Sequence, residues 1–142
     1  MQRTLNITNK VEELAAMNKF LLDICKELAI SETLTMKLNL VMEEIVANII
    51  MYAYNNTPVE SCINITVHET SGLLTFTFAD EGIPFDPTLQ PNPNITLPAD
   101  KRAIGGLGIF LVRSIMDGVT YKRWNGQNLL TTWIMINKQQ YE

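Results

Sequence analysis

Apolar residues recur every three or four positions in two long segments near the start of the chain, and this spacing predicts two amphipathic helices. The first stripe covers residues 11–28 and the second covers residues 34–52. One member of the second stripe, Asn48, is polar. Ser31 or Thr33 can cap the second helix, because a hydroxyl at that position accepts a hydrogen bond from a backbone amide of the first turn.

Alternation of apolar and polar residues marks the strands, since successive side chains of a strand point to opposite faces of a sheet. Residues 63–68 and 74–78 alternate in this way on either side of a Ser-Gly turn, which predicts a hairpin. A second hairpin is expected from residues 119–124 and 129–136, which flank an Asn-Gly turn. Weak alternation over residues 4–8 predicts a short first strand.

The predicted order is strand, helix, helix, strand, strand, long loop, helix, strand, strand. Helices grouped against hairpins predict an α+β fold, a two-layer α/β sandwich with a mixed, mainly antiparallel sheet and the helices on one face. The hairpins argue against a doubly wound parallel sheet. A length of 142 residues is that of one domain, so we interpret residues 1–142 as a single unit.

The long loop, residues 80–105, holds five of the six prolines and shows no periodic pattern. Loops of this length inside a compact domain are uncommon and are usually binding loops or lids. Gly105 at the end of this loop, together with Gly106 and Gly108, opens a short helix over residues 109–117. Glycines before a helix N-terminus expose backbone amides to an anion, and the helix dipole favours phosphate there, so this segment predicts a phosphate cradle.

Composition and charge limit the kinds of binding partner that can be expected for this chain. The apolar fraction of 46% and the charged fraction of 18% are typical of a folded domain, and the net charge of −4 gives no general attraction to nucleic acid or anionic lipid. No apolar run approaches the roughly 18–20 residues of a membrane helix. We therefore expect a cytoplasmic protein without direct nucleic-acid or membrane binding. Cys25 and Cys62 are predicted to be inert core residues.

The first candidate for chemistry is the pair Glu44 and Asn48. At about 100° per residue, these two side chains lie about 40° apart on one helix face, whereas Glu43 is about 140° from Asn48. A carboxylate on such an apolar helix is costly unless something polar meets it. The same spacing also arises by chance on solvated helix faces, so the pattern alone leaves both interpretations open.

The second candidate is Asp80 with Gly82, at the end of a predicted strand. A carboxylate there can accept a hydrogen bond from an exocyclic amine, and a glycine two residues later lets the backbone approach a flat ring closely. Asp-Glu-Gly is equally a good turn sequence, so a purely structural role stays open for this segment.

Together, in this order, the three segments resemble the histidine-kinase-like ATPase superfamily, also called GHKL or Bergerat-fold. Asp80-x-Gly-x-Pro-Phe-Asp86 and the run Gly-Gly-Leu-Gly-Ile-Phe-Leu-Val from Gly105 are especially similar to the bacterial anti-sigma factor serine kinases. The resemblance covers most of the chain. It implies a Bergerat ATP-binding fold that uses ATP and Mg²⁺.

Carried over residue by residue, the resemblance implies that Glu44 is the general base, that Asn48 binds both nucleotide and Mg²⁺, and that Asp80 accepts from the adenine amino group beside Gly82. The remaining nucleotide contacts that it implies are Gly105, Gly106, Leu107, Gly108 and Thr132, with residues 83–104 as the ATP lid. The family tends to have Gly-Thr-Thr in its last strand, where this chain reads Leu130-Thr131-Thr132.

The function implied by the resemblance is that of an ATP-dependent protein serine kinase and anti-sigma regulatory factor. It would phosphorylate a small anti-sigma-factor antagonist, sequester a sigma factor and form a homodimer. The alternative is a nucleotide-sensing, protein-binding module without efficient phosphoryl transfer. The two differ at Glu44, which the kinase needs as a base and the sensor does not.

Overall fold

The computed structural model describes residues 1–55, 61–90 and 106–136. Its helical elements are η1 (Val11–Glu13), α1 (Leu14–Glu27), α2 (Glu32–Asn48), η2 (Ile49–Ala53), η3 (Pro87–Leu89) and α3 (Gly106–Ile115). Its strands are β1 (Gln2–Thr8), β2 (Cys62–Thr70), β3 (Leu73–Asp80), β4 (Gly118–Trp124) and β5 (Gln127–Met135). This is the order of elements that the sequence predicted.

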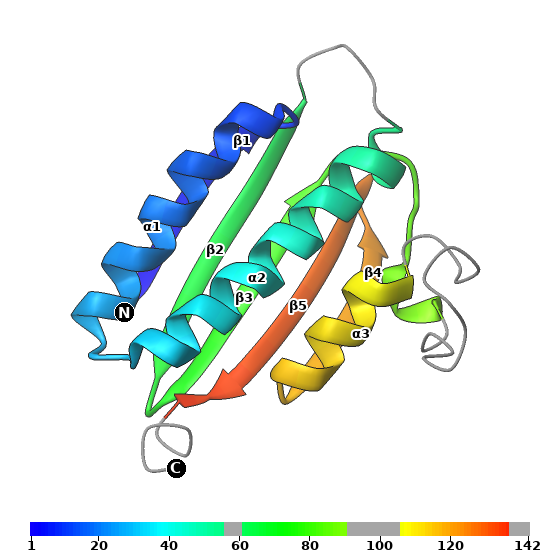
Figure 1. The fold of residues 1–142 in the computed structure, drawn as a ribbon. Helices are drawn as coiled ribbons and strands as arrows, with labels where there is room; N and C mark the ends of the chain where they lie inside the picture. The colour runs from blue at the N-terminus through cyan, green and yellow to red at the C-terminus, as the bar shows by residue number, and fades with distance from the viewer. Residues whose placement is uncertain (56–60, 91–105, 137–142) are drawn as a thin grey trace.

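The strands form one five-stranded sheet in the order β1-β2-β3-β5-β4. All four pairings are antiparallel, where the sequence predicted a mixed, mainly antiparallel sheet. The α-helices lie side by side on one face, with α2 in the middle between α1 and α3 (Figure 1). The predicted α+β two-layer fold with helices on one face is confirmed.

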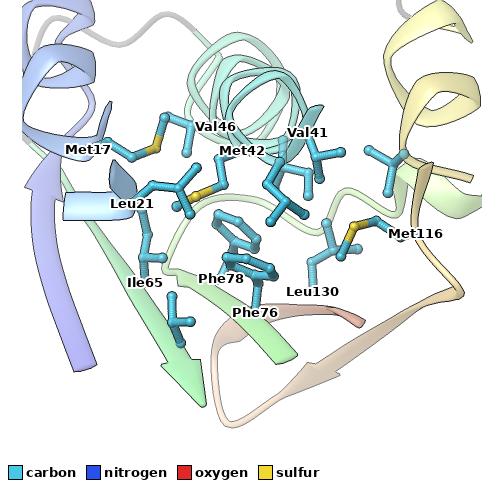
Figure 2. Close-up of a cluster of buried hydrophobic side chains, with 14 of the residues drawn as sticks. Met17, Leu21, Val41, Met42, Val46, Ile65, Phe76, Phe78, Met116 and Leu130 are labelled. Carbon is cyan, nitrogen blue, oxygen red and sulfur yellow. The ribbon is translucent and has the colours of Figure 1, made fainter. Parts of the chain in front are cut away.

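The core fills the space between α2 and the inner faces of the central strands. Phe76 and Phe78 of β3 lie beneath Met42 of α2 (Figure 2), and all three side chains are fully buried. Burial of each such side chain is worth roughly 1.5–3 kcal/mol. This packing fixes α2 against β3, and it therefore fixes the helix that carries Glu44 relative to the strand that ends at Asp80.

Two local predictions can be compared with the structure. Of the two predicted caps, Ser31 is the one that caps α2, and its Oγ accepts from the backbone amide of Leu34 at 3.2 Å. Cys25 is buried as expected, but Cys62 is exposed, because it occupies an outward-facing position of β2. The prediction of a core role for Cys62 is therefore wrong.

Candidate functional site

Glu44 and Asn48 lie one turn apart near the C-terminal end of α2, and both side chains are half-buried. Asn48 is the last residue of α2, which continues directly into the π-helical turn η2. The neighbouring Glu43 has a different partner, since Nδ2 of Asn39 donates to its Oε1 at 3.2 Å. Glu44, and not Glu43, thus shares a helix face with Asn48.

Gly108, in the first turn of α3, packs against this pair. A β-carbon on Gly108 would lie 2.9 Å from Oε2 of Glu44 and 3.5 Å from Nδ2 of Asn48. The first of these distances is shorter than a van der Waals contact, so a side chain at position 108 would require the Glu44 carboxylate to move. The structure thus brings together three residues that the sequence assigned to one site.

Of the other two glycines of the predicted phosphate cradle, the structure describes only Gly106. Gly106 and Leu107 begin α3, which has 10 residues, whereas Gly105 lies outside the described residues, as does most of the predicted lid. The first backbone amides of a helix have no acceptor within the helix, and the dipole places positive potential at this end. The N-terminus of α3 therefore offers anion-binding character beside Glu44 and Asn48.

Asp80 ends β3 and is 3% exposed. Its Oδ1 accepts hydrogen bonds from the backbone amide of Gly82 at 2.9 Å and from Nδ2 of Asn128 at 2.8 Å. Burial raises the pKa of the Asp80 carboxyl, whereas the hydrogen bonds from Asn128 and Gly82 and the charge of Arg123 lower it. Asp80 is thus a buried acid with a built hydrogen-bonding environment.

Asn128 is a site residue that the sequence reasoning missed. It lies directly opposite Asp80 in the β3–β5 register, and its side chain is buried. The signal was present in the alternation of β5, where the inward positions 128, 130, 132 and 134 begin with an amide instead of an apolar residue. A buried amide needs partners, and here they are Asp80 and the segment that follows it.

The close packing of Gly82 against the backbone of η2 explains why this position is a glycine. A β-carbon there would lie 2.4 Å from the carbonyl oxygen of Ala53 and 2.6 Å from its carbonyl carbon, both in the backbone of η2. The next residue, Ile83, donates its amide to that oxygen at 2.8 Å, and Arg123 donates to the Gly82 carbonyl at 2.7 Å. The segment after Asp80 is thus held between η2 and the β4–β5 hairpin.

A small pocket connects the two halves of the site. Its free volume is about 20 Å³, about the space of one water molecule, so a purine base needs the lining to move before it can enter. One wall is Phe85, whose ring stacks on Tyr52 with 4.9 Å between centroids. The pocket is lined by Ile45, Asn48, Ile49, Ala53, Asp80, Phe85, Pro87, Ile109, Tyr121, Asn128 and Leu130.

Thr132 lies elsewhere in β5. Its side chain is fully buried, and its Oγ1 donates to the Gly118 carbonyl at 2.7 Å. It pairs with Phe76, four residues along β5 from Asn128, which is about 13 Å in an extended strand. The structure does not bring Thr132 to Asp80, and Asn128 occupies the position opposite that carboxylate.

Comparison with known proteins agrees with this fold. A family model described as a histidine kinase-like ATPase domain matches residues 7–134, and the chain belongs to that family. One relative, the serine/threonine-protein kinase BtrW of Bordetella bronchiseptica, is 32% identical over 102 residues, which make up 71% of this chain and 70% of the relative.

Two solved structures share the fold. A crystal structure of the RsbU and RsbW domains of a Mycobacterium tuberculosis protein matches with a TM-score of 0.66 at 10% identity, over 96% of this chain and 32% of that one. The histidine kinase domain of a blue-light activated histidine kinase from Erythrobacter litoralis matches with a TM-score of 0.51 at 16% identity, over 76% of this chain and 47% of that one. The chain thus spans about a third and about half of these two structures.

Two further observations bear on partners. None of the helices in the described part of the chain is long and apolar enough to span a membrane. Within the same residues, no group of three or more His, Cys, Asp and Glu side chains is placed to hold a metal ion.

Proposed function

We propose that this chain is an ATP- and Mg²⁺-dependent protein serine kinase that also acts as an anti-sigma factor. The observation that carries the proposal is the cluster of Glu44, Asn48 and Gly108, in which a carboxylate, an amide and the first turn of α3 meet beside the pocket that holds Asp80. A carboxylate, an oxygen ligand for Mg²⁺ and a helix N-terminus for phosphate are what phosphoryl transfer requires.

At the base end, Asp80 accepts a hydrogen bond from the 6-amino group of adenine. Its Oδ1 already accepts two hydrogen bonds, and no described residue donates to its Oδ2. Guanine presents a carbonyl oxygen in place of that amino group, so an ionised Asp80 favours adenine over guanine. Apolar residues such as Ile49 and Ile109 line the same pocket and suit the faces of a purine ring.

At the phosphate end, ATP supplies the phosphoryl group and Mg²⁺ neutralises charge on the phosphate oxygens. The residues here fit such a group. Asn48 offers an amide oxygen, which Mg²⁺ accepts as a ligand, and Gly108 leaves open the space that a side chain would fill. The N-terminus of α3 favours the negative charge of the phosphates.

Glu44 acts as the general base. As the oxygen of a substrate serine forms its bond to the γ-phosphorus and the bond from that phosphorus to ADP breaks, the hydroxyl proton passes to the Glu44 carboxylate. Glu44 lies one turn from Asn48 on α2, which supports a base next to the proposed metal ligand. Gly105, Gly106 and Leu107 complete the set of nucleotide-binding residues in this proposal, with residues 83–104 as the lid.

The partners are proposed from the relatives. BtrW is by name a serine/threonine-protein kinase, and one similar structure contains an RsbW domain. We assign to this chain a serine on a small anti-sigma-factor antagonist as the phosphate acceptor, and a sigma factor as the protein that it sequesters. A homodimer in the cytoplasm is the proposed working form.

The test is transfer of radiolabelled phosphate from ATP to a protein co-purified from cytosol. Glu44→Gln keeps the side-chain size but removes the base, so transfer should fall by roughly 10²–10⁴ while ATP affinity changes no more than a few-fold. Glu43→Gln is the matched control, because Glu43 contacts Asn39 and does not share the face of Asn48. Transfer at the wild-type rate by Glu44→Gln would contradict the role of Glu44 as the base. Absence of transfer by the wild type would contradict the kinase function and favour a nucleotide-sensing module.

A further inference from the structure

The side chain of Asn128 makes five hydrogen bonds with groups from three segments of the chain. Its Oδ1 accepts from the backbone amide of Phe85 at 3.3 Å, from Nη1 of Arg123 at 3.2 Å, and from the hydroxyl of Tyr121. Its Nδ2 donates to Oδ1 of Asp80 and to the carbonyl of Ile83, each at 2.8 Å.

These contacts allow only one orientation of the amide. A rotation by 180° would turn the amide nitrogen toward the amide of Phe85 and the Arg123 guanidinium, which are both donors, and would leave Asp80 without one of its two donors. The three donors around Oδ1 thus hold Nδ2 against Asp80. Asn128 itself has no unused donor for a ligand, so it acts on a bound base through Asp80.

We propose that Asn128 is a positioning residue that sets the purine specificity of the site, because it holds Asp80 so that its second oxygen, Oδ2, is the acceptor left for a base. This inference rests on the proposed binding of an adenine nucleotide. Gly82 and Asn128 together occupy Oδ1, which leaves one carboxylate oxygen to distinguish an amino group from a carbonyl group at position 6 of the purine.

The same amide holds the wall of the pocket. Through Ile83 and Phe85, Asn128 binds the backbone of the segment that contributes the Phe85 ring to the lining. Arg123 adds a bond to the carbonyl of Gly82. Asn128 therefore holds both Asp80, which recognises the base, and the backbone of the segment after it. This segment lines the pocket that must widen before a purine can enter.

The charged and titratable groups around Asp80 come from several elements. Arg123 and Tyr121 project from β4, Tyr54 follows η2, and Glu81 is the next residue in the chain. Arg123 is the cation of this set, and it contacts Asn128 rather than replacing it. The amide of Asn128 is neutral and faces Oδ1 of Asp80. Replacing it by a carboxylate adds a negative charge next to that oxygen.

The experiment compares the dissociation constants of ATP and ITP, which differ only in the base, by calorimetry with Mg²⁺ from about pH 5.5 to about pH 8.5. Asn128→Asp keeps the acceptor for Tyr121, Arg123 and Phe85 but places a carboxylate oxygen against Asp80. Two such carboxyls share a proton at low pH and repel each other once it is lost. Because ATP and ITP carry the same triphosphate, titration of the phosphates cancels in the ratio.

We expect the wild-type preference for ATP over ITP to be constant across this range. In Asn128→Asp the preference should be near the wild-type value at the acidic end and should fall by roughly 10- to 100-fold as the pH rises, the span of a hydrogen bond to a charged group. Asn125→Asp, in the exposed turn of the same hairpin, adds the same charge away from Asp80 and should behave as the wild type.

A preference that does not change with pH in Asn128→Asp, whether high or low throughout, would overturn the positioning role. If that variant does not fold, Arg123→Gln replaces it, since Arg123 is exposed. The preference should then fall by about 2- to 5-fold, because one of the three donors that hold the amide is lost. Lys122→Gln is the matched control, and an unchanged ratio in Arg123→Gln would overturn the inference. Equal affinities for ATP and ITP in the wild type would instead contradict the proposed adenine site, and this inference would fail with it.

Discussion

A β-carbon on Gly108 would lie 2.9 Å from Oε2 of Glu44, so any side chain at position 108 would require the Glu44 carboxylate to move. The two residues are 64 positions apart in the chain and come from different helices. Because a carboxylate side chain can rotate, the cost of adding a methyl group there falls on the position of Glu44 and not on the backbone.

Gly108→Ala should therefore separate catalysis from folding. Alanine is a better helix former than glycine by about 1 kcal/mol, so the melting temperature should not fall by more than a few degrees. Displacement of Glu44 should lower phosphate transfer by roughly 10- to 100-fold. Ser114→Ala, on an exposed position of the same helix, is the control. Wild-type transfer by Gly108→Ala would show that Glu44 does not need its present position.

Asn48→Ala should weaken nucleotide binding in a way that depends on the metal. The wild type should bind ATP more tightly with Mg²⁺ than with EDTA, and the variant should lose most of that difference, roughly 10-fold or more, together with transfer. Asn39→Ala removes an amide from the same helix that contacts Glu43 instead, and it should keep the metal effect. Titration calorimetry with and without Mg²⁺ measures both. An Asn48→Ala protein with the full metal effect would contradict the assignment of Asn48.

Asp80→Asn should lower the affinity for ATP and raise the stability of the free protein. Loss of the acceptor oxygen should weaken ATP binding by roughly 10- to 100-fold and reduce the preference for ATP over ITP. Burial raises the pKa of Asp80 above its ordinary value of 3.8, so the ionised form costs more free energy in the folded protein than in the unfolded chain. The variant without nucleotide should therefore melt about 1–5 °C higher than the wild type near pH 7.

The sign of the pH dependence follows from the direction of that shift. A group whose pKa is raised by folding contributes stability that is fully present below its unfolded pKa and is lost as the pH rises through its folded pKa. The stability advantage of Asp80→Asn should thus shrink as the pH falls through the acidic range toward 3.8. Thermal melting of both proteins at several pH values tests this, with Glu81→Gln as the control for an adjacent exposed carboxylate. A constant difference at all pH values would contradict it.

The residues of α2 were predictable because their relation is local. Helical spacing alone places Glu44 and Asn48 on one face and Glu43 on another, and the structure shows both. The strand that ends at Asp80 was predictable from alternation, again within a few residues. The sequence pattern therefore predicted the arrangement of residues within each helix or strand.

Relations between elements were harder to predict. Asn128 lies opposite Asp80 only because β5 pairs with β3 in one particular register, and a register across 48 positions is set by the whole core. The same register places Thr132 beside Phe76, far along the strand from the carboxylate. The sequence showed a turn after Asp80, but not that Gly82 would meet the backbone of η2.

That contact gives the last prediction, Gly82→Ala. The added methyl group would lie 2.4 Å from the carbonyl oxygen of Ala53, which is a backbone atom that cannot rotate away. Either η2 or the segment after Asp80 must shift, and the hydrogen bond from the Ile83 amide to that oxygen would be strained or lost. We expect a loss of about 1–3 kcal/mol in the free energy of unfolding, the usual cost of overpacking.

Nucleotide binding should be affected as well, because Ala53 and Asp80 line the same pocket. ATP affinity should fall by roughly 10-fold or more even at a temperature where the variant is fully folded, since the segment that follows Asp80 is displaced. Glu81→Ala changes the adjacent exposed side chain without entering η2 and should leave both quantities near the wild type. Chemical denaturation and calorimetry on the same samples separate the two effects. A Gly82→Ala protein as stable as the wild type would show that the close approach to Ala53 is not needed, whereas a destabilised variant with unchanged ATP affinity would confine the role of Gly82 to folding.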